Sequence, residues 1–264
     1  MTAARASARP AASRTVDRVR LLGCEIDRLD MSATLARCIE IVERRETVRH
    51  LAINAAKIVA LHDDERLRDA TAGCALINAD GQAVVWASRL LGDPLPERVA
   101  GIDLMQGLLA LSAERGYGVF FLGAREPVLQ RALERIRSDH PNLRIAGAHH
   151  GHFADTENAD VCAEIEAVAP DILFVAMSSP RKEYWLGENA SRLGTPLAMG
   201  VGGTLDVLAS ATRRAPRWAQ RAGLEWAFRL LQEPRRLFGR YLKTNVRFVW
   251  LVARELAARW TRRR

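Results

Sequence analysis

Polar side chains stand immediately after several short apolar runs of this sequence, where catalytic groups of α/β enzymes are found. Asp80 follows one such run within Asn78-Ala-Asp-Gly81, and Asn54 ends the run before it. The other polar or glycine-rich segments placed in this way are 98–103, 120–124, 178–183 and 200–204. Because the carboxyl ends of parallel strands converge on one crevice, these segments are expected to share a site. The sequence therefore predicts an enzyme more than a scaffold.

Asp80 is the candidate for proton transfer. An unperturbed aspartate has a pKa of about 4, so its carboxylate is ionised near neutral pH and can accept a proton. Asn54 ends the preceding strand, and the two side chains are expected to face each other. The alternative role of Asp80 is structural, because Asp-Gly is a common turn and an aspartate before a helix is often its N-cap.

Two further segments are candidates for anion binding. Gly123 closes an apolar strand, and the helix expected from residue 127 points its N-terminus at the same place. This arrangement favours binding of a phosphate. It is also common in α/β proteins where it has only a structural role. Segment 178–183 opens another helix. In a functional interpretation Arg181 or Lys182 contacts a polyanion or a sugar, whereas in a structural one Glu183 is only a favourable first-turn acid.

The remaining motifs argue against cofactor chemistry. Gly202 and Gly203 suit a close backbone approach, but their turn matches neither the dinucleotide-binding nor the ATP-binding glycine pattern. The histidines at 149, 150 and 152 match no zinc or iron spacing, and no Asp-x-Asp pair occurs anywhere. We therefore predict no metal and no cofactor, so that arginine, lysine and helix N-termini meet any phosphate charge.

The elements that must position these residues alternate between buried strands and helices. Expected strands cover 19–26, 50–53, 75–78, 118–122, 143–146, 172–177 and 197–199. Expected helices cover 31–45, 55–72 with a break near Asp63-Asp64, 82–91, 102–115, 127–138, 157–168 and 181–192. Asp30 is the expected N-cap of the first helix and Gly116 the expected stop of the fourth. This alternation predicts an α/β fold with a Rossmann-like parallel sheet flanked by helices.

Charge divides the chain into unequal parts. Residues 213–264 carry 15 of the 39 Lys and Arg but 3 of the 31 Asp and Glu, a net charge of +12, whereas residues 1–212 carry −4. We expect a disordered lead over 1–16 that is not a secretory signal, an α/β core over 17–212, and a basic helical appendage over 213–264. No run approaches the roughly 20 apolar residues of a transmembrane helix. The four cysteines show no CxxC pair, which is typical of reduced thiols in a cytosolic protein.

The appendage reads as a basic amphipathic helix over 218–260, without any strand. An approximate apolar stripe is formed by Leu237, Tyr241, Phe248, Val252 and Leu256. Arginines mixed with aromatic residues favour a membrane interface. The alternatives are a solvated helical face and a non-specific affinity for nucleic acid. The acidic core and the lack of a recognisable nucleic-acid-binding motif weigh against a nucleic-acid partner.

Taken together, these motifs form a recognisable set. Its members are Asn54, 78–81, 98–103, the Phe-Leu-Gly turn at 121–123, the Ser-Pro-Arg-Lys-Glu run at 179–183, 200–206, 214–216, 224–226 and 233–236. Over about residues 17–250 the chain resembles the WecG/TagA/CpsF glycosyltransferase family. That family makes bacterial cell-surface polysaccharides and teichoic-acid linkage units.

The resemblance implies an inverting transfer of a sugar, often of the N-acetylmannosamine type, from a UDP-sugar to a polyprenyl-diphosphate-linked acceptor. It implies Asp80 as the base, Asn54 as a substrate contact and Arg98 as a cation near the substrate. Further substrate-binding candidates within the matched motifs are Asp103, Gly123, Lys182, Glu183, Gly202, Gly203, Asp206 and Arg214. The appendage is implied to help close the site and to meet the inner face of the plasma membrane. A chain ended after Thr212 is accordingly expected to keep a folded core with little transfer activity.

Two positions depart from the family's usual pattern. Ala52 stands where threonine is common, and Lys182 stands where glutamine is common. The added cation suits a more anionic donor such as a uronic acid, or else it is a subgroup trait without chemical meaning. These departures also leave a second interpretation open, in which the protein is non-catalytic and binds a nucleotide-sugar as a regulator or scaffold. Self-association would be consistent with an exposed apolar stripe on the appendage.

Overall fold

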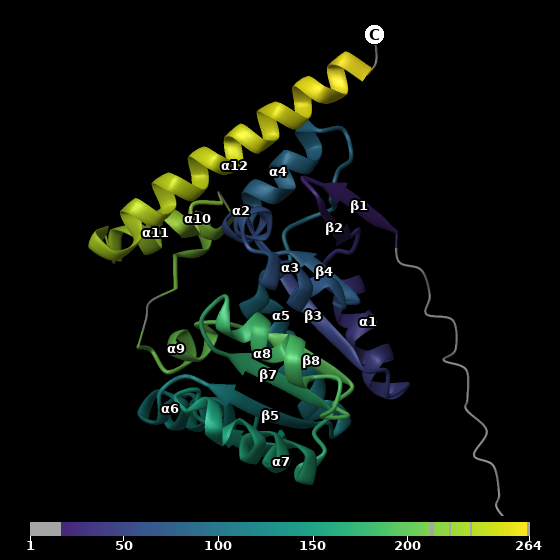
Figure 1. Ribbon diagram of the computed structural model, residues 1–264. Coiled ribbons are helices and arrows are strands. Elements are labelled where there is room, and N and C mark those ends of the chain that lie inside the picture. The colour runs from purple at the N-terminus through teal and green to yellow at the C-terminus, as the bar shows by residue number, and fades with distance from the viewer. Residues whose placement is uncertain (1–16, 212–213, 222, 233, 263–264) are drawn as a thin grey trace, which may run out of the picture.

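A six-stranded parallel sheet forms the centre of the computed structural model, which describes residues 17–211, 214–221, 223–232 and 234–262 (Figure 1). The order across the sheet is β4-β3-β8-β7-β5-β6. Its strands are β3 (Val48–Ile53), β4 (Leu76–Ala79), β5 (Gly118–Gly123), β6 (Arg144–His149), β7 (Ile172–Ala176) and β8 (Leu197–Gly200). A separate antiparallel hairpin consists of β1 (Arg18–Leu21) and β2 (Cys24–Asp27). The predicted parallel α/β fold is confirmed.

Helices connect the strands and cover both faces of the sheet (Figure 1). Those of the core are α1 (Met31–Glu43), α2 (Ala55–Asp63), α3 (Glu65–Ala72), α4 (Gln82–Leu90), α5 (Gly101–Arg115), α6 (Glu126–Asp139), α7 (Asn158–Val168), α8 (Arg181–Asn189) and α9 (Thr204–Leu208), with a short 3-10 turn, η1 (Asp155–Glu157). The appendage adds α10 (Arg217–Arg221), α11 (Glu225–Gln232) and α12 (Pro234–Arg262).

Local sequence signals account for the ends of several helices. Asp30 accepts a hydrogen bond from the Ala33 N–H, as its predicted N-cap role requires. Asp64 ends α2 and caps α3 through the Leu67 N–H, which explains the predicted break. Gly116 stops α5 in the left-handed region with φ +74°, a conformation that glycine adopts without steric cost.

Strand residues alternate between the two faces of the sheet, so β3, β4, β5, β7 and β8 contribute to apolar cores on both faces, whereas the edge strand β6 packs against one. On one face Phe121 and Phe174 stack with centroids 5.8 Å apart, among residues of α1, α5 and α6. On the other face Phe120 and Leu173 pack with α7 and α8. Towards β3 and β4 this second face packs instead with the hairpin, α2, α4 and α12. These cores hold the carboxyl edge of the sheet rigidly enough to carry a site.

A buried polar chain crosses the first of these faces. The His50 Nε2 lies 3.1 Å from the Asn78 Oδ1, and the Asn78 amide donates to the Thr34 hydroxyl at 3.0 Å. The Thr34 hydroxyl in turn donates to the Asp30 carbonyl. All three side chains are almost fully buried, His50 being 3% exposed. This series of buried hydrogen bonds therefore connects β3 and β4 to the first turn of α1.

His50 makes the stability of the fold depend on pH. Burial lowers the pKa of its imidazole from 6.5 to about 4, with the Asn78 contact opposing part of that shift. Between those values the unfolded chain binds a proton that the folded chain rejects, so acidification favours unfolding. We expect His50 to remove up to about 3 kcal/mol of stability across this window. Urea unfolding at several pH values checks this. His50→Gln should flatten the profile while the exposed-site control His152→Gln should not, and identical profiles for wild type and His50→Gln would contradict it.

Helix α12 presents two apolar stripes, and the predicted one faces inward. Phe248 and Val252 pack into the core beside Leu251, because the hairpin, α2 and α4 offer an apolar surface there. Leu256 of the same predicted stripe is 40% exposed, and the side chain of Leu237 lies outside the described residues. The central members of the stripe named from the sequence are therefore buried and do not supply an exposed surface for self-association.

A second stripe on α12 is exposed to solvent. Its large members, at helical spacing, are Phe238, Leu242, Val246, Val249, Leu256 and Trp260. The helix runs as a long rod along one side of the molecule, opposite the end that carries α7 (Figure 1). Among the described helices none is both long enough and apolar enough to cross a bilayer.

Candidate active site

Asp80 and Asn54 lie side by side at the carboxyl ends of neighbouring strands. Strands β3 and β4 pair in parallel with Ile53 opposite Ala79, and the Asp80 N–H donates to the Ile53 carbonyl at 2.8 Å. A Cβ added to Gly81 would lie 3.1 Å from the Cβ of Asn54, so the two turns are in close contact. The Asn54 Oδ1 caps α2 by accepting from the Lys57 N–H, so its amide nitrogen takes no part in this cap.

The Asp80 carboxylate is held by the start of helix α5. Its Oδ1 accepts a hydrogen bond from the Gly101 N–H at 3.0 Å, and the side chain is half-buried. The prediction that segment 98–103 follows a strand is wrong. This segment follows a loop after α4. It reaches the same edge because the Val99 N–H donates to the Ala79 carbonyl at 2.9 Å. The structure thus places Asp80 at the rim of the sheet with its orientation fixed.

A network of ion pairs lies next to Asp80 and joins the core to the appendage. Arg214 donates both terminal nitrogens to the Asp103 carboxylate at 2.7 Å each. The Glu225 carboxylate of α11 accepts from the Arg98 Nη1 at 2.7 Å and lies 3.7 Å from the Arg214 Nε. Burial opposes the charged form of Arg214, but Asp103, Glu225 and Asp80 outweigh it and hold the pKa above its usual value. Arg98, Asp103 and Arg214 are therefore brought together by these ion pairs, and their contact with a substrate stays a prediction.

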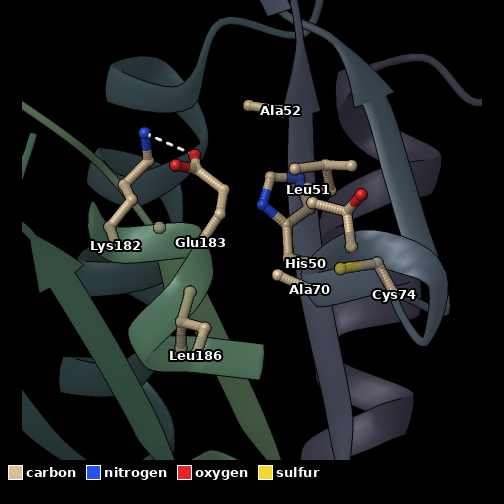
Figure 2. A pocket seen from close by; sticks show the side chains of 10 residues that line it. His50, Leu51, Ala52, Ala70, Cys74, Lys182, Glu183 and Leu186 are labelled. Carbon is tan, nitrogen blue, oxygen red and sulfur yellow. Dashed lines mark ion pairs between the residues drawn. The ribbon is translucent and has the colours of Figure 1, made fainter. Parts of the chain in front are cut away.

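A second charged cluster joins the carboxyl ends of β3 and β7. The Lys57 ammonium donates to Glu183 and, at 2.6 Å, to the Ser179 hydroxyl. Lys182 pairs with the same Glu183 oxygen at 2.7 Å (Figure 2). Ser179 donates to the other oxygen of Glu183 at 2.9 Å. With two ammonium groups and one carboxylate, this cluster carries a net positive charge.

Burial decides how these groups ionise. Burial and the neighbouring Lys182 lower the pKa of Lys57 to about 8, against the opposing effect of Glu183. Burial raises the pKa of Glu183, but Lys182 and Lys57 outweigh it and hold that pKa below its usual range. Lys57 was missed in the sequence, where its only signal is a lysine three residues after Asn54 in an otherwise apolar helix. Figure 2 shows that Lys182 and Glu183 line a pocket. The cavity there has a volume of about 10 Å³, which is too small for a sugar.

Gly123 is explained by packing within the sheet. Its φ is +140°, and an added Cβ would lie 2.4 Å from the Ala176 carbonyl carbon and oxygen, so no other residue fits. Arg181 likewise has a structural task, because it donates to the carbonyls of Gly151 and Phe153 at 2.9 and 3.0 Å. Helix α6 begins three residues after Gly123. The functional interpretation of Gly123 as a phosphate-binding turn stays a prediction.

The turn after β8 borders the same edge of the sheet. Gly202 has φ +56° with open space around it, and the exposed Gly203 precedes α9. The Asp206 Oδ2 lies 3.7 Å from where a Cβ on Gly203 would stand, so Asp206 leans back onto this turn. The candidates that follow strands lie at the carboxyl edge because those strands are parallel, whereas Arg98, Asp103 and Arg214 reach it through loop contacts and ion pairs. The ion pairs divide the charged candidates into the Asp80 network and the Lys57 cluster.

The fold and this edge define a class of protein. A parallel α/β sheet whose carboxyl edge carries a fixed carboxylate, paired arginines and glycine turns is typical of an enzyme acting on an anionic substrate. The chain belongs to the glycosyl transferase WecG/TagA/CpsF family, whose model matches residues 19–262. The resemblance predicted from the motifs is thereby confirmed.

Relatives of known activity lie within this family. The chain is 38% identical over 157 residues to the N-acetylglucosaminyldiphosphoundecaprenol N-acetyl-beta-D-mannosaminyltransferase of Bacillus spizizenii, covering 60% of each chain. It is 36% identical over 178 residues to the protein of the same name from Staphylococcus aureus, covering 67% of this chain and 68% of that one. The match thus spans about three fifths of the length of the first relative.

Proposed function

We propose that this protein is an inverting glycosyltransferase that moves a sugar from a UDP-sugar to a polyprenyl-diphosphate-linked acceptor in bacterial cell-surface polysaccharide biosynthesis. The observation that carries the proposal is the Asp80 carboxylate, fixed by the Gly101 N–H beside the Arg98–Glu225–Arg214 network. The names of the relatives support the lipid-linked acceptor and a mannosamine-type sugar. Those names also state a β-linked product, which an inverting enzyme makes from an α-linked donor.

The proposed reaction assigns one task to each charged group. Asp80 accepts the proton of the acceptor hydroxyl while that oxygen forms a bond to the anomeric carbon. The bond from this carbon to the diphosphate breaks on the opposite face, and the electron pair leaves with UDP. Arg98 and Arg214 stabilise the charge that develops on the diphosphate. The Asn54 amide nitrogen is placed to orient a sugar hydroxyl beside Asp80.

We propose that the identity of the donor sugar depends on Lys182, which is 14% exposed, whereas Lys57 and Glu183 of the same cluster are almost fully buried. The net positive charge of this cluster supports a donor with an added anionic group, such as a uronic acid, as a candidate beside N-acetylmannosamine. A panel of UDP-sugars offered with a polyprenyl-diphosphate-GlcNAc acceptor identifies the donor. Transfer from one member supports the proposal, whereas binding without transfer from any member would favour the non-catalytic regulator or scaffold.

Lys182→Gln tests the donor preference directly. If Lys182 recognises an anionic sugar, the variant is expected to lower kcat/KM for a UDP-uronic acid about tenfold or more and to leave a neutral UDP-sugar little changed. The surface variant Arg20→Gln on the hairpin, where the side chain is 86% exposed, serves as the control. An equal effect on both donors would assign Lys182 to the support of Glu183 alone.

The proposed site of action is the inner face of the plasma membrane, where α12 meets the bilayer. The exposed stripe of α12 lies beside arginines, and Arg254 stacks on the Trp250 ring at 4.8 Å. Apolar and basic residues arranged in this way are typical of helices that lie in a membrane interface. Each Lys or Arg near an anionic leaflet contributes about 1 kcal/mol. Docking would bring the sheet edge to a lipid-borne acceptor.

Vesicle binding tests this surface. The double variant Leu242→Glu/Val249→Glu places two carboxylates on the exposed stripe, where the wild-type side chains are 56% and 65% exposed. We expect it to weaken binding to vesicles with anionic lipids at least tenfold, because apolar area is lost and negative charge is added. Val168→Glu on α7, also exposed, is the control. Equal binding of the double variant and wild type would contradict the role of α12.

A further inference from the structure

Glu225 occupies a position between the two arginines of the Asp80 network. It is the first residue of α11, and its Oε2 accepts from the Arg98 Nη1 at 2.7 Å. Its Oε1 lies 3.7 Å from the Arg214 Nε. The side chain of Arg98 is 15% exposed, that of Glu225 is 20% exposed and that of Arg214 is 21% exposed. Water therefore screens these charges only partly. One carboxylate thus lies between two guanidinium groups that would otherwise repel each other.

The two arginines differ in what remains available to a substrate. Arg214 has both terminal nitrogens on Asp103, and its Nε faces Glu225 and is buried without a hydrogen bond. The Arg98 Nη1 donates a hydrogen bond to Glu225, and the Nε and Nη2 of Arg98 remain as donors for a ligand. Glu225 therefore selects which edge of the Arg98 guanidinium is presented to the crevice.

The backbone around Arg98 links this choice to the catalytic carboxylate. The Val99 N–H is bonded to the end of β4, and the Gly101 N–H is bonded to Asp80. Arg98 thus stands on the same short loop that orients Asp80. Glu225 comes from the appendage and connects α11 to this loop.

We propose that Glu225 is a positioning residue, which fixes the Arg98 guanidinium for the substrate diphosphate. This inference rests on the proposed function for its link to transfer. Its effect on diphosphate binding can be measured without any transfer. Without Glu225, Arg98 and Arg214 separate, and the cation that meets the diphosphate loses its defined orientation.

The test compares Glu225→Gln, Glu225→Asp and the control Glu188→Gln, which removes a carboxylate from the exposed pair with Arg66. Titration calorimetry with UDP is the first readout, and kcat and KM for the donor are the second. We expect Glu225→Gln to weaken UDP binding about tenfold and to lower kcat about tenfold or more. Glu225→Asp, which keeps the charge, should recover part of both. Thermal melting followed by circular dichroism verifies that each variant is folded.

The outcomes separate this inference from the proposed function. Wild-type values for UDP binding and kcat in Glu225→Gln would overturn the inference and leave a structural ion pair. Tighter UDP binding in Glu225→Gln would also overturn it, because Glu225 would then be an anion that the substrate must displace. If the wild type transfers no sugar but Glu225→Gln still weakens UDP binding, the proposed function fails while the positioning of Arg98 stands.

Discussion

Replacing Asp80 by asparagine is expected to lower kcat for sugar transfer about a thousandfold while UDP-sugar binding changes less than threefold. The amide oxygen can still accept the Gly101 hydrogen bond that holds Asp80 Oδ1 at 3.0 Å, so the local geometry should persist. What is lost is the ability to take a proton, and general-base catalysis contributes about 10²–10⁴ to a rate. Steady-state kinetics with calorimetric titration of UDP-sugar measures both quantities.

A matched control separates loss of the base from loss of a charge. Asp139→Asn removes a carboxylate from α6, where Asp139 pairs with Arg135 on the surface. We expect its kinetics to equal those of the wild type. Transfer by Asp80→Asn within tenfold of the wild-type rate would exclude Asp80 as the base. Loss of both transfer and binding would instead assign it to substrate binding.

Replacing Arg98 by methionine is expected to give the second-largest effect, a fall in kcat/KM of about 10²–10³. Arg98 is the network arginine that keeps donor groups beyond its Glu225 contact, so it is the cation placed to meet the leaving diphosphate. Removing one preorganised donor to developing charge typically costs a factor of this size. Both kcat and the affinity for UDP should fall, because the diphosphate is present in the substrate and in the transition state.

Two companion variants define the chemistry at this position. Arg98→Lys keeps the charge but not the planar fork, and we expect it to restore only part of the activity. Arg20→Met removes an arginine from the hairpin, where its side chain is 86% exposed, and should leave the kinetics unchanged. An Arg98→Met enzyme with wild-type kcat/KM would show that the diphosphate is met elsewhere.

The sequence predicted the alternating elements because each rests on local signals. The apolar strand at 118–122 is buried on both faces in the structure. Asp64 ends α2, where its backbone N–H donates to the Ala60 carbonyl, and starts α3 through its side chain. Placing Asp80 beside Asn54 needed only the inference that successive strands are parallel neighbours. The candidates at strand ends were therefore within reach of sequence reasoning.

Contacts distant in the sequence were not predictable. Strand β8 is last in the chain but lies between β3 and β7, and no local pattern specifies that order. The pairs Lys57–Glu183 and Arg98–Glu225 span 126 and 127 residues. Whether an apolar stripe of a helix faces the core depends on where the rest of the molecule offers apolar surface. The sequence placed Phe248 in an apolar stripe of this helix but did not show that the stripe packs into the core.

The stereochemistry of the product tests the central claim most directly. Wild type and Asp80→Asn are incubated with an α-linked UDP-sugar of the N-acetylmannosamine type and a polyprenyl-diphosphate-GlcNAc acceptor, and the new linkage is assigned by NMR. A single base on the face of the sugar opposite the leaving diphosphate predicts a β-linked product from the wild type and almost none from Asp80→Asn. An α-linked product, or equal yields from the two proteins, would contradict the assignment of Asp80 as the base of an inverting transfer.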